Sequence, residues 1–213
     1  MPTFDSLATE YDAWFDGKGK LLFEMEVRAF REVLPLLPKP WLEIGVGSGR
    51  FAQALGIKTG IDPSASLLEM AIKRDITGYL SRGEAMPFAT GSFGTAFLIV
   101  TFCFLDTPAE ALREAHRILI AEGKLVLGVV LRESPWGRYY LQKKKEGHRF
   151  YKHAHFFRYQ EIDDLLSQSG FAIEKTISTL FQKPEEVNKI ELPQEHFHPD
   201  AGFTIIVAKK LPH

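Results

Sequence analysis

The sequence has little cysteine and no long apolar run. Cys103 is the single cysteine among 213 residues, so no intramolecular disulfide can form and a buried, reduced thiol is expected. No stretch approaches the roughly 20 apolar residues that a membrane helix needs, and the first ten residues lack the basic and apolar segments of a secretory signal. These absences predict a soluble, cytoplasmic protein without a membrane partner.

Excess charge of either sign is absent as well. The chain has 26 basic and 27 acidic residues, a formal net charge of −1, and a pI of about 6.7. The field of the whole molecule therefore does not favour nucleic acid as a partner. A composition that is 45% hydrophobic and 25% charged predicts one globular α/β domain over residues 1–213. The sequence does not indicate an oligomeric state.

Three closely spaced glycines are the most informative feature. A short apolar run at residues 41–44 passes into a turn at 45–49, with glycine at its first, third and fifth positions, and a helical pattern follows at 50–55. Glycines in such a turn permit positive φ and let a ligand approach the backbone. The N–H groups of the following helix point at the turn, which suits an anionic or strongly hydrogen-bonding ligand.

The spacing of these glycines separates the possible nucleotide sites. Gly49 is followed by Arg50 and Phe51 rather than by Lys-Ser or Lys-Thr, which excludes a Walker A loop. A dinucleotide fingerprint reads G-x-G-x-x-G, whereas this turn reads G-x-G-x-G and is preceded by an acid, Glu43. A glycine-rich connector in an ordinary α/β domain remains the alternative that involves no ligand.

The acid and the glycines together match the pattern E-x-G-x-G-x-G, and here the sequence resembles the class I S-adenosylmethionine-dependent methyltransferases. The resemblance extends over residues 11–209. It implies S-adenosylmethionine as cofactor and an acid that fixes the turn or binds the methionine ammonium group. The cofactor residues that it implies in this segment are Glu43, Gly45, Val46, Gly47 and Gly49.

A second acid follows at the end of the next predicted strand, residues 58–62. Asp62 falls 17 residues after Gly45, close to the spacing at which an α/β nucleotide site uses an acid to accept from ribose hydroxyls. A carboxylate accepts from two hydroxyls at once, so Asp62 predicts a free ribose. Pro63, at the start of the next helix, is assigned to the same site. An N-cap role for Asp62 is the alternative.

Residues 81–88 resemble the family segment G-D-A-x-x-L-P-F. The resemblance implies that Glu84 accepts from the adenine amino group, or that the backbone at Ala85 recognises the ring instead, with Met86 beside them. Glu84 is one methylene longer than the usual aspartate. A solvated surface acid is the alternative.

Residues 95–101 are nearly continuously apolar, which predicts a central strand buried on both faces. Ligands of open α/β sheets bind where such strands end, so Thr101 and Phe102 are expected to line the cofactor site near the methyl group. Core packing is the alternative for Phe102. Many relatives carry polar or histidine residues after this strand, and their absence here leaves the catalytic residue unknown.

Two weak candidates for catalysis come from the segments expected to cover the site. In the family an N-terminal helical cap, here residues 1–37, commonly lies over the cofactor, which makes Tyr11 a candidate; packing on the core is the alternative. His155 lies in residues 132–159, a long connection that we interpret as a lid near the active site. No H-E-x-x-H helix or thiolate partner accompanies the histidines, so no metal is expected.

The predicted fold is α/β: a Rossmann-like methyltransferase fold with a mostly parallel seven-stranded sheet, an antiparallel last strand, and helices on both faces. Parallel neighbours need a crossover that is usually helical, and the proline-containing segment 181–202 shows no helical pattern. The last strand, residues 203–209, is therefore expected to run antiparallel.

The predicted function is methyl transfer from S-adenosylmethionine to an O or N atom of a small-molecule acceptor. Two alternatives remain. One is a non-catalytic module that binds S-adenosylmethionine or S-adenosylhomocysteine, because no general base is evident. The other is a nicotinamide-dependent oxidoreductase, which the glycine spacing and the missing last crossover disfavour.

Overall fold

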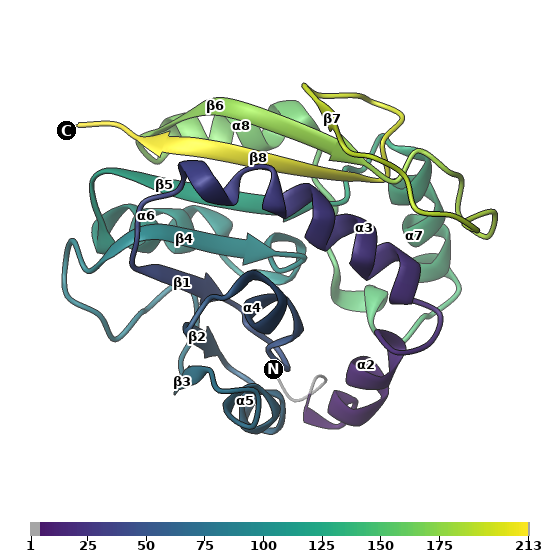
Figure 1. Ribbon diagram of the computed structural model, residues 1–213, viewed down its shortest axis with the longest axis horizontal. Helices are drawn as coiled ribbons and strands as arrows, with labels where there is room; N and C mark the ends of the chain where they lie inside the picture. Colours follow the sequence, from purple (N-terminus) through teal and green to yellow (C-terminus); the bar gives the residue numbers. More distant parts are fainter. Residues whose placement is uncertain (1–4, 213) are drawn as a thin grey trace.

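A twisted sheet runs through the centre of the molecule in the computed structural model, which describes residues 5–212 (Figure 1). Within that range the sheet has eight strands in the order β3-β2-β1-β4-β5-β8-β6-β7. Neighbours in the first five positions pair in parallel. The bounds of those strands are β1 (Trp41–Ile44), β2 (Thr59–Asp62), β3 (Thr77–Leu80), β4 (Phe93–Ile99) and β5 (Leu119–Val129).

The C-terminal part of the sheet reverses direction. β8 (Phe203–Lys210) inserts between β5 and β6 (Phe171–Thr179) and is antiparallel to both, which confirms the expected direction of the last strand. The sheet nevertheless has one strand more than predicted, because β7 (Gln194–Glu195) pairs antiparallel with β6. Both residues of β7 are exposed, so this two-residue strand has no alternating apolar pattern that the sequence could show.

Helices cover both faces of the sheet, as predicted. In Figure 1, α3 and α4 cross in front of the sheet, whereas α6 and α8 lie behind it. Adjacent residues of β4 point to opposite faces, so Phe97 packs in the cluster with Phe30 of α3, and Leu98 packs in the cluster with Leu112 of α6. The helices are α2 (Ala8–Trp14), α3 (Lys20–Arg31), α4 (Arg50–Leu55), α5 (Ala65–Ile72), α6 (Pro108–Ile118), α7 (Pro135–Lys145) and α8 (Tyr159–Gln168).

Two segments gather beyond the carboxyl ends of the parallel strands. One is α2, which precedes α3, and the other is α7 with the following 3-10 helix η3 (Tyr151–His153) (Figure 1). Two further 3-10 helices are η1 (Leu34–Leu36) and η2 (Phe102–Phe104), of which η2 directly follows β4. Between residues 5 and 212, no helix combines the length and the apolar character that crossing a bilayer requires.

The short helix α4 has a glycine in the left-handed region at each end. Gly49, at the N-cap, has φ +82°, and a Cβ placed on it would lie 2.9 Å from the Cα of Ala71 in α5. Gly56, at the C-cap, has φ +76°, and a Cβ there would meet no atom within 4 Å. The two positions therefore share the conformational requirement for glycine and differ in packing.

This difference predicts unequal effects of alanine on stability. We expect Gly56→Ala to lower the free energy of unfolding by about 1 kcal/mol, the cost of a left-handed L-residue. Gly49→Ala should lower it by about 2–4 kcal/mol, because the backbone of α5 must also move. Urea denaturation of the two variants measures both values. Equal losses would show that the close approach of α5 to Gly49 does not constrain the fold.

Candidate active site

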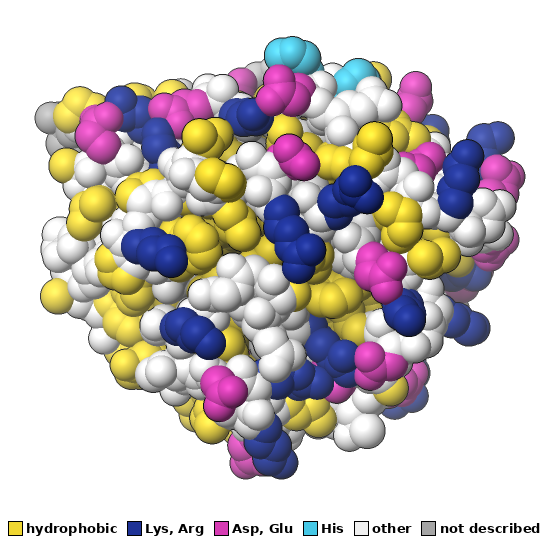
Figure 2. Space-filling model, viewed as in Figure 1, with side chains coloured by type: hydrophobic (Ala, Val, Ile, Leu, Met, Phe, Trp, Pro, Cys, Tyr) yellow, Lys and Arg dark blue, Asp and Glu magenta, His cyan; other side chains and the backbone are white. Residues whose placement is uncertain are grey.

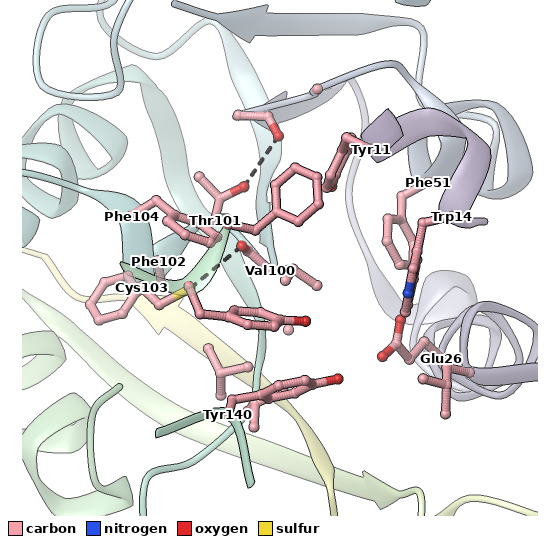
Figure 3. A pocket seen from close by; sticks show the side chains of 18 of the residues that line it. Tyr11, Trp14, Glu26, Phe51, Val100, Thr101, Phe102, Cys103, Phe104 and Tyr140 are labelled. Atoms are coloured by element: carbon pink, nitrogen blue, oxygen red, sulfur yellow. Dashed lines mark hydrogen bonds between the residues drawn. The ribbon is translucent and has the colours of Figure 1, made fainter. Parts of the chain in front are cut away.

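A cavity of about 1030 Å³ lies where the parallel strands end. Its wall joins the glycine turn and the end of β2 to the segment after β4, the helices α2 and α3, and the lid formed by α7 and η3 (Figure 3). Most of the lining side chains are apolar or aromatic. The aromatic ones are Tyr11, Trp14, Phe15, Phe51, Phe102, Phe104, Trp136, Tyr139, Tyr140, Phe150, Tyr151, Phe156 and Phe157.

The four turn residues assigned to the cofactor, Gly45, Val46, Gly47 and Gly49, do not share one role. Gly45 and Gly47 line the cavity, with φ values of +74° and +53°. A Cβ on Gly45 would lie 2.3 Å from the Thr101 side chain, whereas on Gly47 the nearest atom would be a ring carbon of Tyr11 at 3.7 Å. Val46 is buried and, like Gly49, lies outside the cavity wall. The structure thus gives the first two glycines the contact surface and the other two residues a packing role beneath it.

Asp62 connects the end of β2 to the glycine turn. Its Oδ2 accepts from the Gly47 N–H at 2.8 Å, and its Oδ1 accepts from the Ser64 N–H at 2.8 Å. Burial raises the pKa of Asp62, and these two backbone donors partly oppose that rise. Each carboxylate oxygen has a second lone pair, so two further donors can bind from the cavity, as the hydroxyls of a ribose would. Pro63 lines the cavity beside it.

Glu43 lies in β1, beneath the turn and outside the cavity wall. It is 1% exposed, and its Oε2 has no hydrogen-bond partner among residues 5–212. Burial and the neighbouring Asp62 raise the pKa of Glu43 well above its usual value, and the Ala52 N–H partly opposes this. Of the two roles that the resemblance implied, this position favours fixing the turn over binding the methionine ammonium group directly.

The segment expected at the adenine is only partly in the cavity wall. Glu84 lines the cavity, but its Oε1 accepts from the backbone N–H groups of Asp106 and Thr107 at 3.2 and 3.3 Å. Ala85 is exposed and Met86 is buried in the core, so neither side chain is in the wall. In the tight turn that pairs Ala85 with Arg82, the Ala85 N–H donates to the Arg82 carbonyl at 3.2 Å. Contact of Ala85 and Met86 with the cofactor stays a prediction.

The residues that follow β4 lie in the cavity wall, as expected from their position at the carboxyl end of a central strand. Thr101 and Phe102 both line the cavity, and the Thr101 hydroxyl donates to the Gly45 carbonyl at 3.1 Å. Phe102 is also 1% exposed and packs on Phe157, so it serves the core as well as the wall. Cys103 is only partly buried, because it faces the cavity; desolvation raises the pKa of its thiol to about 12, which keeps it protonated.

Neither weak candidate for catalysis is placed as a base. Tyr11 lines the cavity from α2. Burial and, to a smaller extent, the negative charges of Asp62 and Glu43 raise the pKa of its phenol, which therefore stays protonated near neutral pH. His155 is exposed and outside the wall, because the alternating lid backbone buries Ala154 and Phe156 instead. Base catalysis by His155 stays a prediction.

Helix α2 is held over the glycine turn by two arginines. Asp12 accepts from Arg50 Nε at 2.9 Å and from Arg74 Nη2 at 2.9 Å, and Arg74 Nη1 also donates to the Ser48 carbonyl at 2.8 Å. Burial would raise the pKa of Asp12, but the hydrogen bonds from Arg50 and Arg74 outweigh it and lower that pKa well below its usual value. This contact fixes the position of Tyr11 above the turn.

Glu26 is a site residue that sequence reasoning missed. It lies on α3, lines the cavity and is 7% exposed, and no residue between 5 and 212 forms a hydrogen bond or ion pair with it (Figure 3). Burial alone raises its pKa to about 8. A signal was available, because Glu26 falls four residues from both Leu22 and Phe30 and so interrupts the apolar stripe of its helix.

The basic residues of the lid do not form a site of their own. Lys143 pairs with Glu146 at 3.4 Å, and Lys144 donates to the Ala154 carbonyl at 2.6 Å. Figure 2 shows basic and acidic side chains interspersed on the face presented there rather than gathered by sign. In the described range, no three His, Cys, Asp or Glu side chains group in a way that could hold a metal ion.

Comparison with known proteins agrees with this geometry. Residues 42–127 match the family described as methyltransferase domain. A Thermotoga maritima protein named as an S-adenosylmethionine-dependent methyltransferase, possible histamine N-methyltransferase, has a crystal structure with 39% identity and a TM-score of 0.90, covering 98% of both chains. A Mycobacterium tuberculosis protein of uncharacterised function is 37% identical over 97% of this chain and 73% of its own length. The demethylmenaquinone methyltransferase of T. maritima is 31% identical over 60% of this chain and 59% of its own.

The attachment of α2 predicts a specific loss of ligand affinity. We expect Asp12→Asn to weaken binding of S-adenosylhomocysteine by about tenfold, because disrupting the three charge-assisted hydrogen bonds from Arg50 and Arg74 frees the helix that places Tyr11 over the turn. Asp16→Asn is the matched control: Asp16 also accepts from Arg50, but its side chain is 69% exposed, so a change below about twofold is expected. Calorimetric titration measures both affinities. Equal losses of affinity in the two variants would contradict the role of Asp12 in holding α2 over the turn.

Glu26 predicts a dependence of stability on pH. Its pKa rises from a usual value of 4.5 to about 8 in the fold, so between these values the native state holds a proton that the unfolded chain releases. Stability is therefore lost as the pH rises through this range. The glutamine in Glu26→Gln cannot titrate. The free energy of unfolding of this variant should therefore exceed that of the wild type by an amount that grows from near zero at pH 5 to about 3–5 kcal/mol at pH 9. Thermal unfolding against pH measures it; the exposed Glu24→Gln on the same helix should show no such trend.

Proposed function

This chain belongs to the S-adenosylmethionine-dependent methyltransferase family, and we propose that it methylates an O or N atom of a small molecule held in the cavity of about 1030 Å³. The family membership makes the chain a methyltransferase with S-adenosylmethionine as its cofactor. The methyl acceptor is what we propose in addition.

One observation carries the proposal: the wall of the same cavity has a polar part and an apolar part. Gly45, Gly47 and Asp62, at the ends of β1 and β2, form the polar part of its wall, and the aromatic side chains of η2, α7 and η3 form the apolar part. Pockets for one small ligand span about 300–1000 Å³, so a cavity of about 1030 Å³ can hold the cofactor together with a small acceptor. A lining rich in aromatic rings suits an acceptor with an apolar body.

The residues present fit the cofactor. Bound S-adenosylmethionine supplies a methyl group on a sulfonium, a good leaving group, so the protein needs no covalent intermediate. Asp62 can accept from two ribose hydroxyls in addition to its two backbone donors. Gly47 leaves its cavity side open, since a Cβ there would meet its nearest neighbour at 3.7 Å. Tyr11 and the rest of α2 cover this end and exclude water from the reacting atoms.

Relatives support a small acceptor over a macromolecule. The two named relatives from T. maritima carry the names of small acceptors, histamine for one and demethylmenaquinone for the other. These acceptors are properties of those proteins, and they indicate which chemical classes to test on this chain. The non-catalytic alternative was motivated by a missing base, and Glu26 in the cavity wall weakens that motive. The antiparallel β8 argues against the nicotinamide alternative.

Titration with S-adenosylhomocysteine tests the site. We expect a micromolar dissociation constant, about −8 kcal/mol, with no competition from NADH. Asp62→Asn should weaken binding by at least about tenfold, because it replaces one acceptor oxygen by a donor. The exposed Asp75→Asn, after α5, is the matched control and should bind as the wild type does. If the wild type binds no S-adenosylhomocysteine, the assignment of the cavity fails.

A screen with labelled methyl donor then tests the acceptor. Phenols, alcohols, aliphatic and aromatic amines, histamine, protein extract and RNA are incubated with the protein, and label should enter a small molecule. Incorporation into protein or RNA alone would contradict the proposal.

A further inference from the structure

We infer that the acceptor is a primary or secondary amine whose ammonium group binds Glu26 and gives its proton to that carboxylate before the nitrogen is methylated. The inference rests on the proposed function and identifies its substrate class. It starts from Glu26, an acid on α3 that the binding of S-adenosylmethionine does not explain.

Glu26 faces the cavity without a partner from the protein. Its side chain is 7% exposed and lines the wall, and within residues 5–212 it has no hydrogen bond or ion pair. Buried carboxyl groups are normally hydrogen-bonded or paired, because an isolated buried charge is strongly unfavourable. A buried acid directed into a cavity is therefore suited to a partner that arrives with the ligand.

The groups that face Glu26 do not carry positive charge. Tyr11 on α2, Tyr140 on α7 and Tyr151 in η3 are each close enough for its charge to act on them, and Cys103 adjoins Tyr151. Burial raises the pKa of Tyr140 well above its usual value and those of Tyr151 and Cys103 to about 12, so all of these groups are neutral near pH 7. Glu26, with a pKa of about 8, is the one carboxyl group among them, and His148 lines the same cavity beside Tyr151, with ring centroids 4.7 Å apart.

The lysines that reach the cavity are placed elsewhere. Lys18 is exposed, and Lys143 lies over the Tyr139 ring at 5.4 Å and pairs with Glu146. Because burial is the cause of the raised pKa and no cation opposes it, the surroundings of Glu26 favour an added positive charge. The rings nearby strengthen this preference, since aromatic faces attract ammonium groups.

This arrangement discriminates between acceptor classes. A carboxylate or phenolate acceptor would be repelled once Glu26 ionises, and an alcohol would gain only a neutral hydrogen bond. An ammonium group would gain an ion pair in a site shielded from water and contact with aromatic faces. Of the small acceptors with O or N nucleophiles, an amine is therefore the class that this cluster recognises.

Glu26 lies across the cavity from the residues that follow β4. Figure 3 shows it beside Trp14 and Phe51, opposite Thr101 and Cys103, which lie on the same side of the cavity. The carboxyl group and the aromatic rings thus line one cavity. An amine there would have its head at Glu26 and its apolar body among those rings.

The chemical step balances. The ammonium N–H bond breaks and its proton moves to a carboxylate oxygen of Glu26, which leaves a nitrogen lone pair. That lone pair forms the new N–C bond to the methyl carbon, while the C–S bond breaks and its electron pair stays on sulfur as a neutral thioether. The methylated amine leaves as an ammonium ion, and Glu26 keeps the transferred proton, which restores the protonated state that it had before the amine bound. One proton is released per turnover, when Glu26 ionises on amine binding.

Calorimetry with matched probes tests this inference. With S-adenosylhomocysteine bound, 2-phenylethylamine is compared with 2-phenylethanol, and cyclohexylmethylamine with cyclohexylmethanol, at pH 7 in two buffers of different ionisation enthalpy. We expect each amine to bind at least about tenfold more tightly than its alcohol and to release close to one proton, because Glu26 is protonated before the amine arrives.

Variants assign the effect to the carboxyl group. Glu26→Gln should abolish the proton release and weaken amine binding about tenfold or more, and Glu26→Asp should retain part of both. The affinity for S-adenosylhomocysteine should stay within about twofold in each variant. Glu24→Gln, exposed on the same helix, should match the wild type throughout.

Several outcomes would overturn the inference. Alcohols that bind as tightly as their amines would do so, as would unchanged proton release in Glu26→Gln. If Glu26→Gln weakens the binding of S-adenosylhomocysteine as strongly as it weakens the binding of the amine, the carboxylate binds the cofactor instead. Label transferred from S-adenosylmethionine to phenols or alcohols but not to amines would remove the inference and leave the proposed function intact. Absence of S-adenosylhomocysteine binding in the wild type would remove the proposed function itself.

Discussion

The contact between Asp62 and the glycine turn is the constraint on which the site depends. By accepting from the Gly47 N–H at 2.8 Å, the carboxylate joins the ends of two adjacent parallel strands, β1 and β2. The turn can come this close because Gly45 and Gly47 have positive φ, which few L-residues adopt. The cofactor end of the cavity is therefore formed by backbone that the sheet itself holds in place, and the remaining walls are added by segments outside the sheet.

Two acids are buried in or near the site. Glu26, in the cavity wall, is 7% exposed, and Glu43, in β1 beneath the glycine turn, is 1% exposed; burial raises the pKa of both. Neither acid stabilises the fold in its charged form, because desolvation opposes ionisation. Glu43 lies beneath the turn and outside the cavity wall, whereas Glu26 lines the cavity. Such unfavourable placement is typical of sites where function, rather than stability, selects the residue.

Local sequence patterns predicted much of the fold and part of the site. The apolar run at 95–101 predicted a buried central strand, and the segment without a helical pattern before residue 203 predicted the antiparallel β8; both are confirmed. The resemblance to the methyltransferases is confirmed as family membership. The individual cofactor contacts stay predictions, although the cavity wall contains Gly45, Gly47 and Asp62. The two-residue β7 carries too short a pattern to be recognised.

The sequence by itself determined the glycine turn, the acid after the second strand and the cofactor class, because strand, turn and helix are adjacent in the chain and their spacing is directly visible. The tertiary structure alone decided what surrounds the acceptor. Glu26, Cys103 and Tyr140 are far apart in the sequence and line one cavity only because α3, η2 and α7 converge at one end of the sheet. The same folding turned His155 outward and placed Met86 in the core, since burial is settled by packing between distant segments rather than by residue type.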